Sequence, residues 1–448
     1  MTLKELAAQV KAGTIDTMLV AFPDPFGRLV GKRFRADFFL KSVAEHGTHG
    51  CNYLLTVNLD MDPLEGFELA NWASGFGDFE LRPDLDTFRM LPWQTASALV
   101  ICDLYKPDGS IVAEAPRSVL RRQLEKVRAL GLTCFCASEL EFYLFNQTYH
   151  EAFAGGYREL KPASDYRIDY HLMQPTREES LMRAIRNGMT AARVPIESSK
   201  GEWSRGQHEL NFTYAQPLPM ADMHGLFKQG VREIAEQHGK AVTFMAKYAA
   251  SEAGSSCHLH LSLWKGRQNA FWDPKSKCGS KLFRQFLGGL LQHSRELCLF
   301  VAPTINSYKR YQPGSWAPTR MAWAKDNRTT GFRVVGQGNG FRPENRMPGA
   351  DANPYLAFSA MLAAGLAGIE AGLDCGDPYA GNAYLDEKLE RLPSSLREAT
   401  ALFDGSKLAR LAFGDGVVDY YTRHACLEQE AFGNAVTDWE KQRYFEQI

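Results

Sequence analysis

Acidic and histidine side chains that recur at two-residue spacing are the feature that most constrains this chain. They are Glu139 and Glu141 in SELEFYLF, Glu202 and Glu209 in GEWSRGQHE, His258 and His260 in SCHLHLSL, and Glu344 in RPENR. Because successive side chains of a strand point to opposite faces, residues two apart share a face. A strand carrying Glu139 and Glu141 would therefore aim two like charges into one space. The fold must then bring something positive to that space.

A divalent cation is the natural counter-charge for such a set. Carboxylate oxygens with one or two imidazoles suit Mg²⁺ or Mn²⁺ better than a structural zinc. Mg²⁺ held by carboxylates usually also holds substrate phosphates. Surplus cations follow in the sequence, Arg328 and Arg333 in DNRTTGFRV and Arg342 and Arg346 around Glu344. Arginines beside metal-binding acids stabilise a transferring phosphoryl group, so the residues alone predict a phosphoryl-transfer enzyme.

Each motif taken alone also fits a structural role. The Glu139–Glu141 pair could be the solvated face of an edge strand, and the two acids of GEWSRGQHE could be surface groups on a hairpin. The alternating charges of RPENR could form an ion-pair ladder. The apolar neighbours Cys136, Phe142 and Phe145 favour a buried acidic pair over an exposed one.

Composition excludes several classes of function. With 45% hydrophobic and 23% charged residues over 448 positions, the chain is typical of a globular protein of two domains. A formal net charge of −1 gives no electrostatic basis for binding nucleic acid or a membrane surface. No apolar run reaches the roughly 20 residues that a spanning helix needs. Nine cysteines without a CxxC pair argue against structural zinc and a disulfide framework, and they favour a reducing cytoplasm.

Strand and turn patterns divide the chain near residue 108. We expect a hairpin of strands 17–22 and 28–34 joined by PDPFG, then strands at 53–62 and 96–105 and a KPDG turn. Helical spacing predicts helices over 115–131, 178–192, 221–239, 280–300 and 353–373, the last apolar all round. Segment 301–352 is rich in Pro, Gly, Arg and Asn, which is typical of a functional loop region.

Taken in order, these motifs resemble those of the glutamine synthetase family. The matching strings are the ExE strand, the turn ending in GQHE, the HLH strand, NSYKRYQPG, the DNR segment, RPENR and NPYL. LRPDLDTFRMLPW (81–93) also resembles the small domain of that family. The resemblance implies an α+β protein with a β-grasp domain over 1–108. Over 109–448 it implies a catalytic domain with a curved antiparallel sheet, or half-barrel, flanked by helices. It further implies self-association into a ring, a hexamer or dodecamer, with active sites between subunits.

The family forms an amide bond in two steps. ATP phosphorylates the γ-carboxylate of glutamate, and an amine then attacks the acyl phosphate. By motif position, two or three Mg²⁺ or Mn²⁺ ions are implied, one held by Glu141, Glu202 and Glu209 and another by Glu139, His258 and Glu344. Glutamate would be held by Gly254, Arg310 and Arg346. Arg328 would be catalytic, neutralising the transferring phosphate. ATP would be lined by Tyr214, His260, Ser262, Arg333 and Arg342.

Departures from the ammonia-using members concern the second substrate. Those members carry a glutamate in the loop after NSYKR that helps to deprotonate ammonium, whereas this loop reads PGSWAP with Trp316 at that position. Their FDGSS-like aspartate string is also missing, and the region reads THGCNYLLTV. Asn339 stands where they tend to carry lysine, near the nucleotide. We therefore expect an ATP-dependent γ-glutamyl-amine ligase with Trp316 in the amine pocket. The alternatives are an authentic glutamine synthetase and an inactive scaffold.

Overall fold

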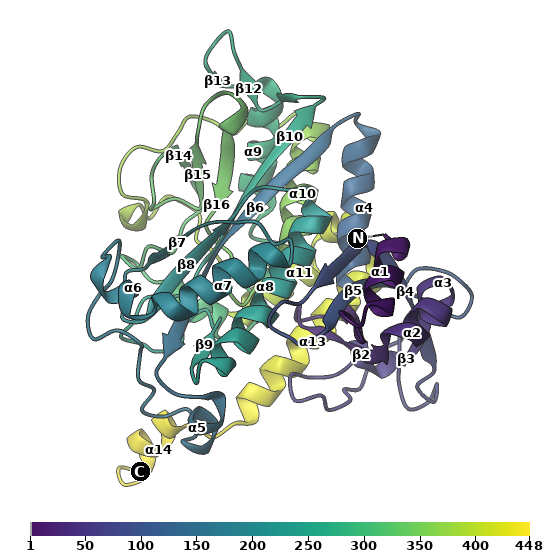
Figure 1. The fold of residues 1–448 in the computed structure, drawn as a ribbon. Helices are drawn as coiled ribbons and strands as arrows, with labels where there is room; N and C mark the ends of the chain where they lie inside the picture. The colour runs from purple at the N-terminus through teal and green to yellow at the C-terminus, as the bar shows by residue number, and fades with distance from the viewer. Residues whose placement is uncertain (1) are drawn as a thin grey trace.

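A small N-terminal sheet packs beside a larger sheet in the computed structural model, which describes residues 2–448 (Figure 1). The small sheet has the order β2 (Leu29–Arg35), β1 (Thr17–Pro23), β5 (Ser97–Tyr105), β4 (Asp78–Met90) and β3 (Thr48–Cys51). Strands β1 and β5 run parallel, while the other neighbouring pairs are antiparallel. The short helices of this part are α1 (Leu3–Lys11), α2 (Ala36–Phe38) and α3 (Ala44–His46). The predicted hairpin and the buried strand at 96–105 are confirmed.

The strand predicted over 53–62 is wrong. Residues Asn52–Leu55 form a 3₁₀ turn, and the chain then bends at NLDMD. The Asn58 side chain accepts hydrogen bonds from the backbone N–H groups of Asp60 (2.9 Å) and Asp62 (2.8 Å). An asparagine that bonds its own neighbouring backbone competes with a strand ladder, so this local chemistry overrides the apolar pattern.

The larger sheet carries the acidic and histidine motifs. Its order is β14 (Trp323–Lys325), β15 (Phe332–Val335), β16 (Arg342–Asn345), β10 (Cys257–Lys265), β6 (Thr133–Phe145), β8 (Gln207–Phe212) and β7 (Ile196–Gly201). β11 (Gln268–Asn269) pairs with β10, β9 (Ala241–Thr243) with β6, and β12 (Trp272–Asp273) with β13 (Cys278–Gly279). The predicted antiparallel sheet needs one correction, because β14 and β15 are parallel and the curved sheet is mixed. Residues 326–331 return the chain to the start of β15, so the two strands run in the same direction.

The larger part of the chain also contains helices. They are α4 (Pro116–Ala129), α5 (Tyr149–Ala154), α6 (Met173–Arg177), α7 (Glu179–Ala191), α8 (Pro217–Gln237), α9 (Lys281–His293), α10 (Pro354–Ala371), α11 (Leu396–Asp404), α12 (Lys407–Phe413), α13 (Asp415–Asn434) and α14 (Asp438–Tyr444). Among them, α4, α7 and α8 pack against strands of the larger sheet. The helix predicted over 280–300 is shorter than expected, since α9 stops at His293 and only Cys298–Phe300 form a further 3₁₀ turn. Among residues 2–448, α10 alone is long and apolar enough to span a membrane, yet 78% of it is buried in the protein core.

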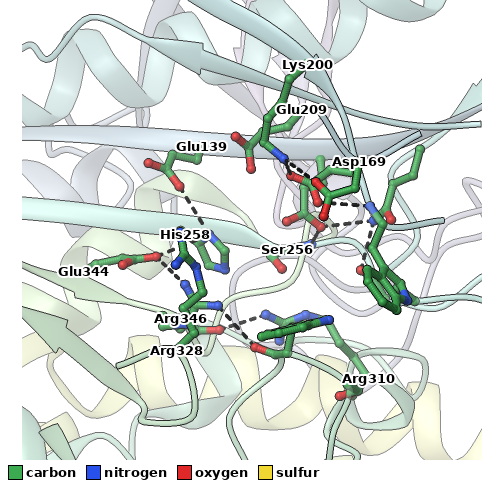
Figure 2. A pocket seen from close by; sticks show the side chains of 18 of the residues that line it. Glu139, Asp169, Lys200, Glu209, Ser256, His258, Arg310, Arg328, Glu344 and Arg346 are labelled. Atoms are coloured by element: carbon green, nitrogen blue, oxygen red, sulfur yellow. Dashed lines mark hydrogen bonds and ion pairs between the residues drawn. The ribbon is translucent and has the colours of Figure 1, made fainter. Parts of the chain in front are cut away.

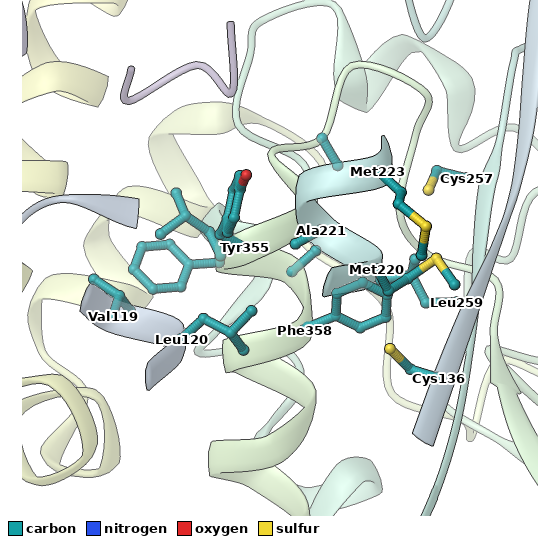
Figure 3. Packing of buried hydrophobic residues seen from close by; sticks show 14 of the residues in the cluster. Val119, Leu120, Cys136, Met220, Ala221, Met223, Cys257, Leu259, Tyr355 and Phe358 are labelled. Carbon is teal, nitrogen blue, oxygen red and sulfur yellow. The ribbon is translucent and has the colours of Figure 1, made fainter. Parts of the chain in front are cut away.

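Alternation along the central strands separates the core from the site. Even-numbered residues of β6, such as Cys136, and odd-numbered residues of β10, such as Leu259, face the helices. There they pack against Met220 of α8 and Phe358 of α10 (Figure 3). The opposite positions of the same strands carry the acids and histidines. Because the apolar face is buried against helices, the polar set must share the other face.

A buried arginine joins the two parts of the chain. Arg117 of α4 is 2% exposed. Its guanidinium pairs with Asp84 (2.9 Å) and Asp103 (2.5 Å) of the small sheet and with Asp222 of α8 (2.9 Å). These contacts lie on either side of the proposed domain boundary near residue 108, so they fix the small sheet against the helical layer of the larger part.

Candidate active site

A cavity of about 460 Å³ opens on the polar face of the larger sheet (Figure 2). Residues from β6, β7, β8, β10, β15 and β16 line it, together with loops before β10 and after residue 310. Of the residues singled out in the sequence, those that line it are Glu139, Glu141, Glu202, Glu209, Gly254, His258, Arg310, Trp316, Arg328, Arg333, Glu344 and Arg346. Segments up to two hundred residues apart therefore meet in one space.

Strand register assembles the first acidic group. Glu139 lies opposite His258 in the β6–β10 ladder, and Glu344 lies on β16, the strand beside β10. The His258 Nδ1 atom is 3.3 Å from a Glu139 oxygen and 3.4 Å from a Glu344 oxygen (Figure 2). One ligand atom from each of the three lies within 4.8 Å of the others. Burial would raise the pKa of Glu139, but the hydrogen bonds from His258 and His260 hold it below the usual range.

The second group comes from the neighbouring ladder. Glu141 of β6 lies opposite Glu209 of β8, and both carboxylates lie within 4.8 Å of a His258 nitrogen. Burial, and the nearby carboxylate of Glu202, raise the pKa of Glu141 to about 7 and that of Glu209 to about 9. Such raised pKa values mean that the protein itself supplies too little positive charge to keep these carboxylates ionised.

Lys200 is a member of the site that the sequence reasoning missed. It lines the cavity from β7, and its ammonium pairs with Glu202 and, at 3.5 Å, with Asp169. Burial would lower the pKa of Lys200, but Glu202 more than offsets this and raises it. Glu202 thus lines the same cavity as Glu141 and Glu209, but its carboxylate faces the ammonium group of Lys200. The available signal was spacing, because Lys200 stands two residues before Glu202.

Glu141 accepts hydrogen bonds from the start of β8 and from the residue just before β10. The Ser256 backbone N–H donates to a Glu141 oxygen at 2.7 Å, and the Gln207 side-chain amide donates to the same oxygen at 3.1 Å. The His258 Nε2 atom is buried and has no hydrogen-bond partner in residues 2–448. Buried carboxylates with raised pKa values beside an unpartnered imidazole nitrogen are the donor set that a divalent cation satisfies. The residues present therefore fit the predicted metal ions.

Buried arginines form the opposite wall. Arg310 and Arg346 are 2% and 3% exposed, and Figure 2 shows them beside Arg328, below His258. Arg310 donates to the backbone oxygens of Met347 (2.9 Å) and Arg346 (2.8 Å). Arg346 donates to Glu344 at 2.6 Å. The Nε atoms of Arg310 and Arg346 are buried without a partner within residues 2–448.

Gly254 is required by its contact with Arg310. A Cβ atom at position 254 would lie 2.5 Å from Arg310 Cγ and 2.8 Å from the Ala246 oxygen. Both separations are far below the roughly 3.5–4.0 Å of an ordinary carbon contact. The glycine thus lets the arginine side chain pass beneath the loop into the cavity.

The residues that the resemblance assigns to ATP lie farther apart than the proposed metal ligands and the glutamate-binding residues. Arg333 lines the cavity and pairs with Glu344 at 3.0 Å; it also borders an adjoining cavity of about 400 Å³. His260 accepts from Arg342 Nε at 3.1 Å and contacts Glu139 at 2.9 Å. Of the five residues assigned to ATP, Arg333 lines both cavities, whereas His260, Arg342, Ser262 and Tyr214 line neither. Ser262 accepts from Trp264 (2.8 Å), and Tyr214 is 61% exposed.

Aromatic side chains mark the rim. Trp316 is 49% exposed, has a left-handed backbone (φ 66°), and its carbonyl accepts from Arg346 at 3.2 Å. Its ring meets that of Trp203 edge-on, with centroids 6.1 Å apart. Trp203 was not singled out in the sequence, although it directly follows Glu202. At position 316 the cavity rim therefore carries an aromatic side chain, whereas the ammonia-using members of the family were expected to carry an acid there.

Comparisons with known proteins agree with this geometry. Residues 113–444 match the model of the glutamine synthetase catalytic domain. The chain is 49% identical over its full length to gamma-glutamylethanolamide synthetase GlnA4 of Streptomyces coelicolor, covering 96% of that protein. It is 36% identical to a glutamate–isopropylamine ligase of a Pseudomonas species, covering 98% of this chain and 97% of that one. A solved GmaS/ADP complex superposes with a TM-score of 0.86 at 27% identity, over 98% and 99% of the two chains. The expected family is confirmed, and this chain belongs to the glutamine synthetase family.

Proposed function

We propose that this protein is an ATP-dependent ligase that forms a γ-glutamyl amide from glutamate and a small organic amine. One observation carries the proposal. A single cavity joins a metal-type acid and imidazole set to four arginines, and its rim holds Trp316 where ammonia-using relatives were expected to place a carboxylate. The relatives named for ethanolamide and isopropylamine ligation, at 49% and 36% identity, support the same chemistry.

The acids divide into two proposed metal sites. Glu139, His258 and Glu344 would hold one Mg²⁺ or Mn²⁺ ion, in keeping with their mutual approach. Glu141, Glu209 and Glu202 would hold another, for which the Glu202 carboxylate must turn from Lys200. When bound, the ions supply counter-charge to the nucleotide phosphates and to these acids.

The arginines handle the two anionic substrates. Arg310 and Arg346 would hold the carboxylates of glutamate, because a guanidinium offers a planar pair of donors. Arg328 would face the γ-phosphoryl group as it passes from ATP to the γ-carboxylate, giving γ-glutamyl phosphate and ADP. The nucleotide would lie toward the adjoining cavity, near Arg333, Arg342 and His260, with Ser262 and Tyr214 at its outer end.

The second step joins the amine. The amine nitrogen attacks the γ-carbonyl carbon, the carbon–oxygen bond to phosphate breaks, and a proton leaves the nitrogen. Trp316 offers apolar area and cation–π attraction to the incoming group, worth roughly 0.5–2 kcal/mol. A small primary amine with a carbon skeleton suits such a wall better than ammonium does.

Assembly and location complete the proposal. We expect a ring-shaped hexamer or dodecamer in which the small domain, residues 1–108, covers the cavity of a neighbouring subunit. We also expect a cytoplasmic enzyme, since ATP and glutamate are its substrates and the net charge of −1 gives no basis for nucleic-acid or membrane partners.

Phosphate release tests the function directly. The purified protein is given ATP, Mg²⁺ and glutamate with ammonium or with a panel of primary amines. We expect an alkyl or hydroxyalkyl amine to be used far faster than ammonium. Fastest use of ammonium would identify a glutamine synthetase instead, and no turnover with any amine would identify an inactive scaffold. Trp316→Glu should shift preference toward ammonium; an unchanged profile in both Trp316→Glu and Trp316→Ala would remove Trp316 from the amine site.

A further inference from the structure

A second indole, Trp203, shares the rim with Trp316 and is fixed to the metal-binding acids. Trp203 directly follows Glu202, and its backbone N–H donates to the Glu202 carboxylate at 3.3 Å. Trp203 lines the cavity and is 37% exposed. The corner formed by Trp203 and Trp316 is thus anchored at both ends, to Glu202 and to Arg346.

The outer face of this corner is positively charged. The Arg167 guanidinium lies over the Trp203 ring at 4.3 Å from its centroid. No carboxylate pairs with Arg167 in the described part of the chain, although its neighbour Asp165 pairs with Arg177. A short loop holds Arg167 there, because buried Ile168 packs against Gly201 and the Tyr170 N–H donates to the Gly201 oxygen at 3.3 Å.

The acid nearest to Arg167 in the cavity lining is already engaged. Asp169 lines the cavity but faces the Lys200 ammonium at 3.5 Å, and Lys200 also lies over the Tyr170 ring at 4.4 Å. An amine whose first ammonium group has passed the indoles would therefore carry its far end toward Arg167. A neutral far end, such as a methyl or hydroxyl group, meets no penalty there, whereas a second ammonium group meets a like charge.

We propose that Trp203, Trp316 and Arg167 form a selectivity corner that admits short primary monoamines and rejects diamines and polyamines. The proposal rests on the proposed ligase function and deepens it. Trp203 and Trp316 supply the apolar walls along which the carbon chain lies. Arg167, which is outside the cavity, acts through charge and is a specificity-determining residue with no part in the chemistry.

A pair of amines of equal length isolates the charge effect. 4-Amino-1-butanol and 1,4-diaminobutane differ only in a terminal hydroxyl or ammonium group, so the ratio of their kcat/KM values reports the selection. We expect the kcat/KM of wild-type protein to favour the amino alcohol by at least about tenfold. The Arg167→Glu substitution should reduce this preference by about tenfold, and high salt should reduce the preference of wild-type protein. The matched control is Arg177→Glu, an exposed arginine of the same region that contacts no cavity ring; it should leave the ratio unchanged.

The walls are tested separately. Trp203→Ala should raise the KM of both four-carbon amines by about tenfold, and Trp203→Phe should restore part of the loss. Turnover with hydroxylamine, which is too small to reach the indoles, and the KM for glutamate should stay as in wild type. Loss of hydroxylamine turnover in Trp203→Ala would overturn the role as a wall and assign Trp203 to the support of Glu202.

Other outcomes separate this proposal from the proposed function. Wild-type protein that ligates amines but uses the diamine as well as the amino alcohol overturns the selectivity corner alone. The same holds if Arg167→Glu leaves the ratio unchanged, or if Arg177→Glu shifts it equally. Wild-type protein that releases phosphate only with ammonium overturns the proposed function itself.

Discussion

Replacing Gly254 by alanine tests whether Arg310 binds glutamate. The added methyl group would lie 2.5 Å from Arg310 Cγ and 2.8 Å from the Ala246 oxygen. That oxygen cannot retreat freely, because it accepts the Ser255 backbone N–H at 2.9 Å. The arginine must therefore move by about 1 Å to reach an ordinary contact distance. The displacement acts on a side chain that is 2% exposed and has little room to move.

The expected magnitude follows from the hydrogen bonds of Arg310. Its guanidinium donates to the backbone oxygens of Met347 (2.9 Å) and Arg346 (2.8 Å), which fix its direction. A hydrogen bond from a charged group contributes about 1.5–3 kcal/mol. Losing one such bond, or the equivalent bond to a substrate carboxylate, corresponds to about a 10- to 150-fold rise in the KM for glutamate.

Initial rates of phosphate release at varied glutamate, with ATP and amine saturating, give the measurement. The KM for ATP should stay within about twofold of wild type, since the nucleotide is proposed to lie toward the adjoining cavity near Arg333. Gly433→Ala is the matched control, because nothing lies within 4 Å of a Cβ at that position of α13. A glutamate KM within twofold of wild type in Gly254→Ala would refute the assignment of Arg310.

Three further predictions concern charge. Glu344→Gln should abolish phosphate release and lower the unfolding temperature, because it leaves Arg346 (2.6 Å) and Arg333 (3.0 Å) without their shared acid, at a cost of about 3–5 kcal/mol; an unchanged unfolding temperature in calorimetry would contradict this. Burial and neighbouring acids raise the pKa of Glu209 from 4.5 to about 9, so metal-free protein should lose stability as the pH rises toward 9, whereas Mg²⁺ should suppress the loss. Equal pH profiles of thermal unfolding with Mg²⁺ and with EDTA would count against it. Arg117→Met should destabilise the protein by about 3–5 kcal/mol while leaving the KM for glutamate unchanged, since it leaves buried Asp222 at the domain junction without an arginine, although Arg121 still pairs with Asp84 and Asp103; wild-type stability in urea would disprove the role of that junction.

Strand alternation determined the main arrangement of the site from sequence alone. Glu139 and Glu141 had to share a face, as did His258 and His260, because period-two geometry leaves no other choice. The apolar residues between them required that face to lie opposite the core, and Cys136 and Leu259 indeed pack against α8 and α10. Motif order was enough to predict the family, which the comparisons confirmed.

The local chemistry of loops was harder to predict. The pattern at 53–62 looked like a strand because alternation was the only signal used, while the Asn58 side chain diverted the backbone into a turn. The parallel pairing of β14 with β15 was also missed, because strand direction depends on the path of the connecting loop through space.

Tertiary structure decided which charges face one another. No spacing rule places Lys200 against Asp169, or Arg167 over the ring of Trp203, since these contacts depend on how separate loops pack. The same holds for the pKa values of Glu141 and Glu209, which arise from burial and from acids brought together by β6, β8 and the turn between β7 and β8. A sequence fixes which groups are available and which face of a strand they share. The distances that set electrostatic energies exist only once those strands and loops are packed.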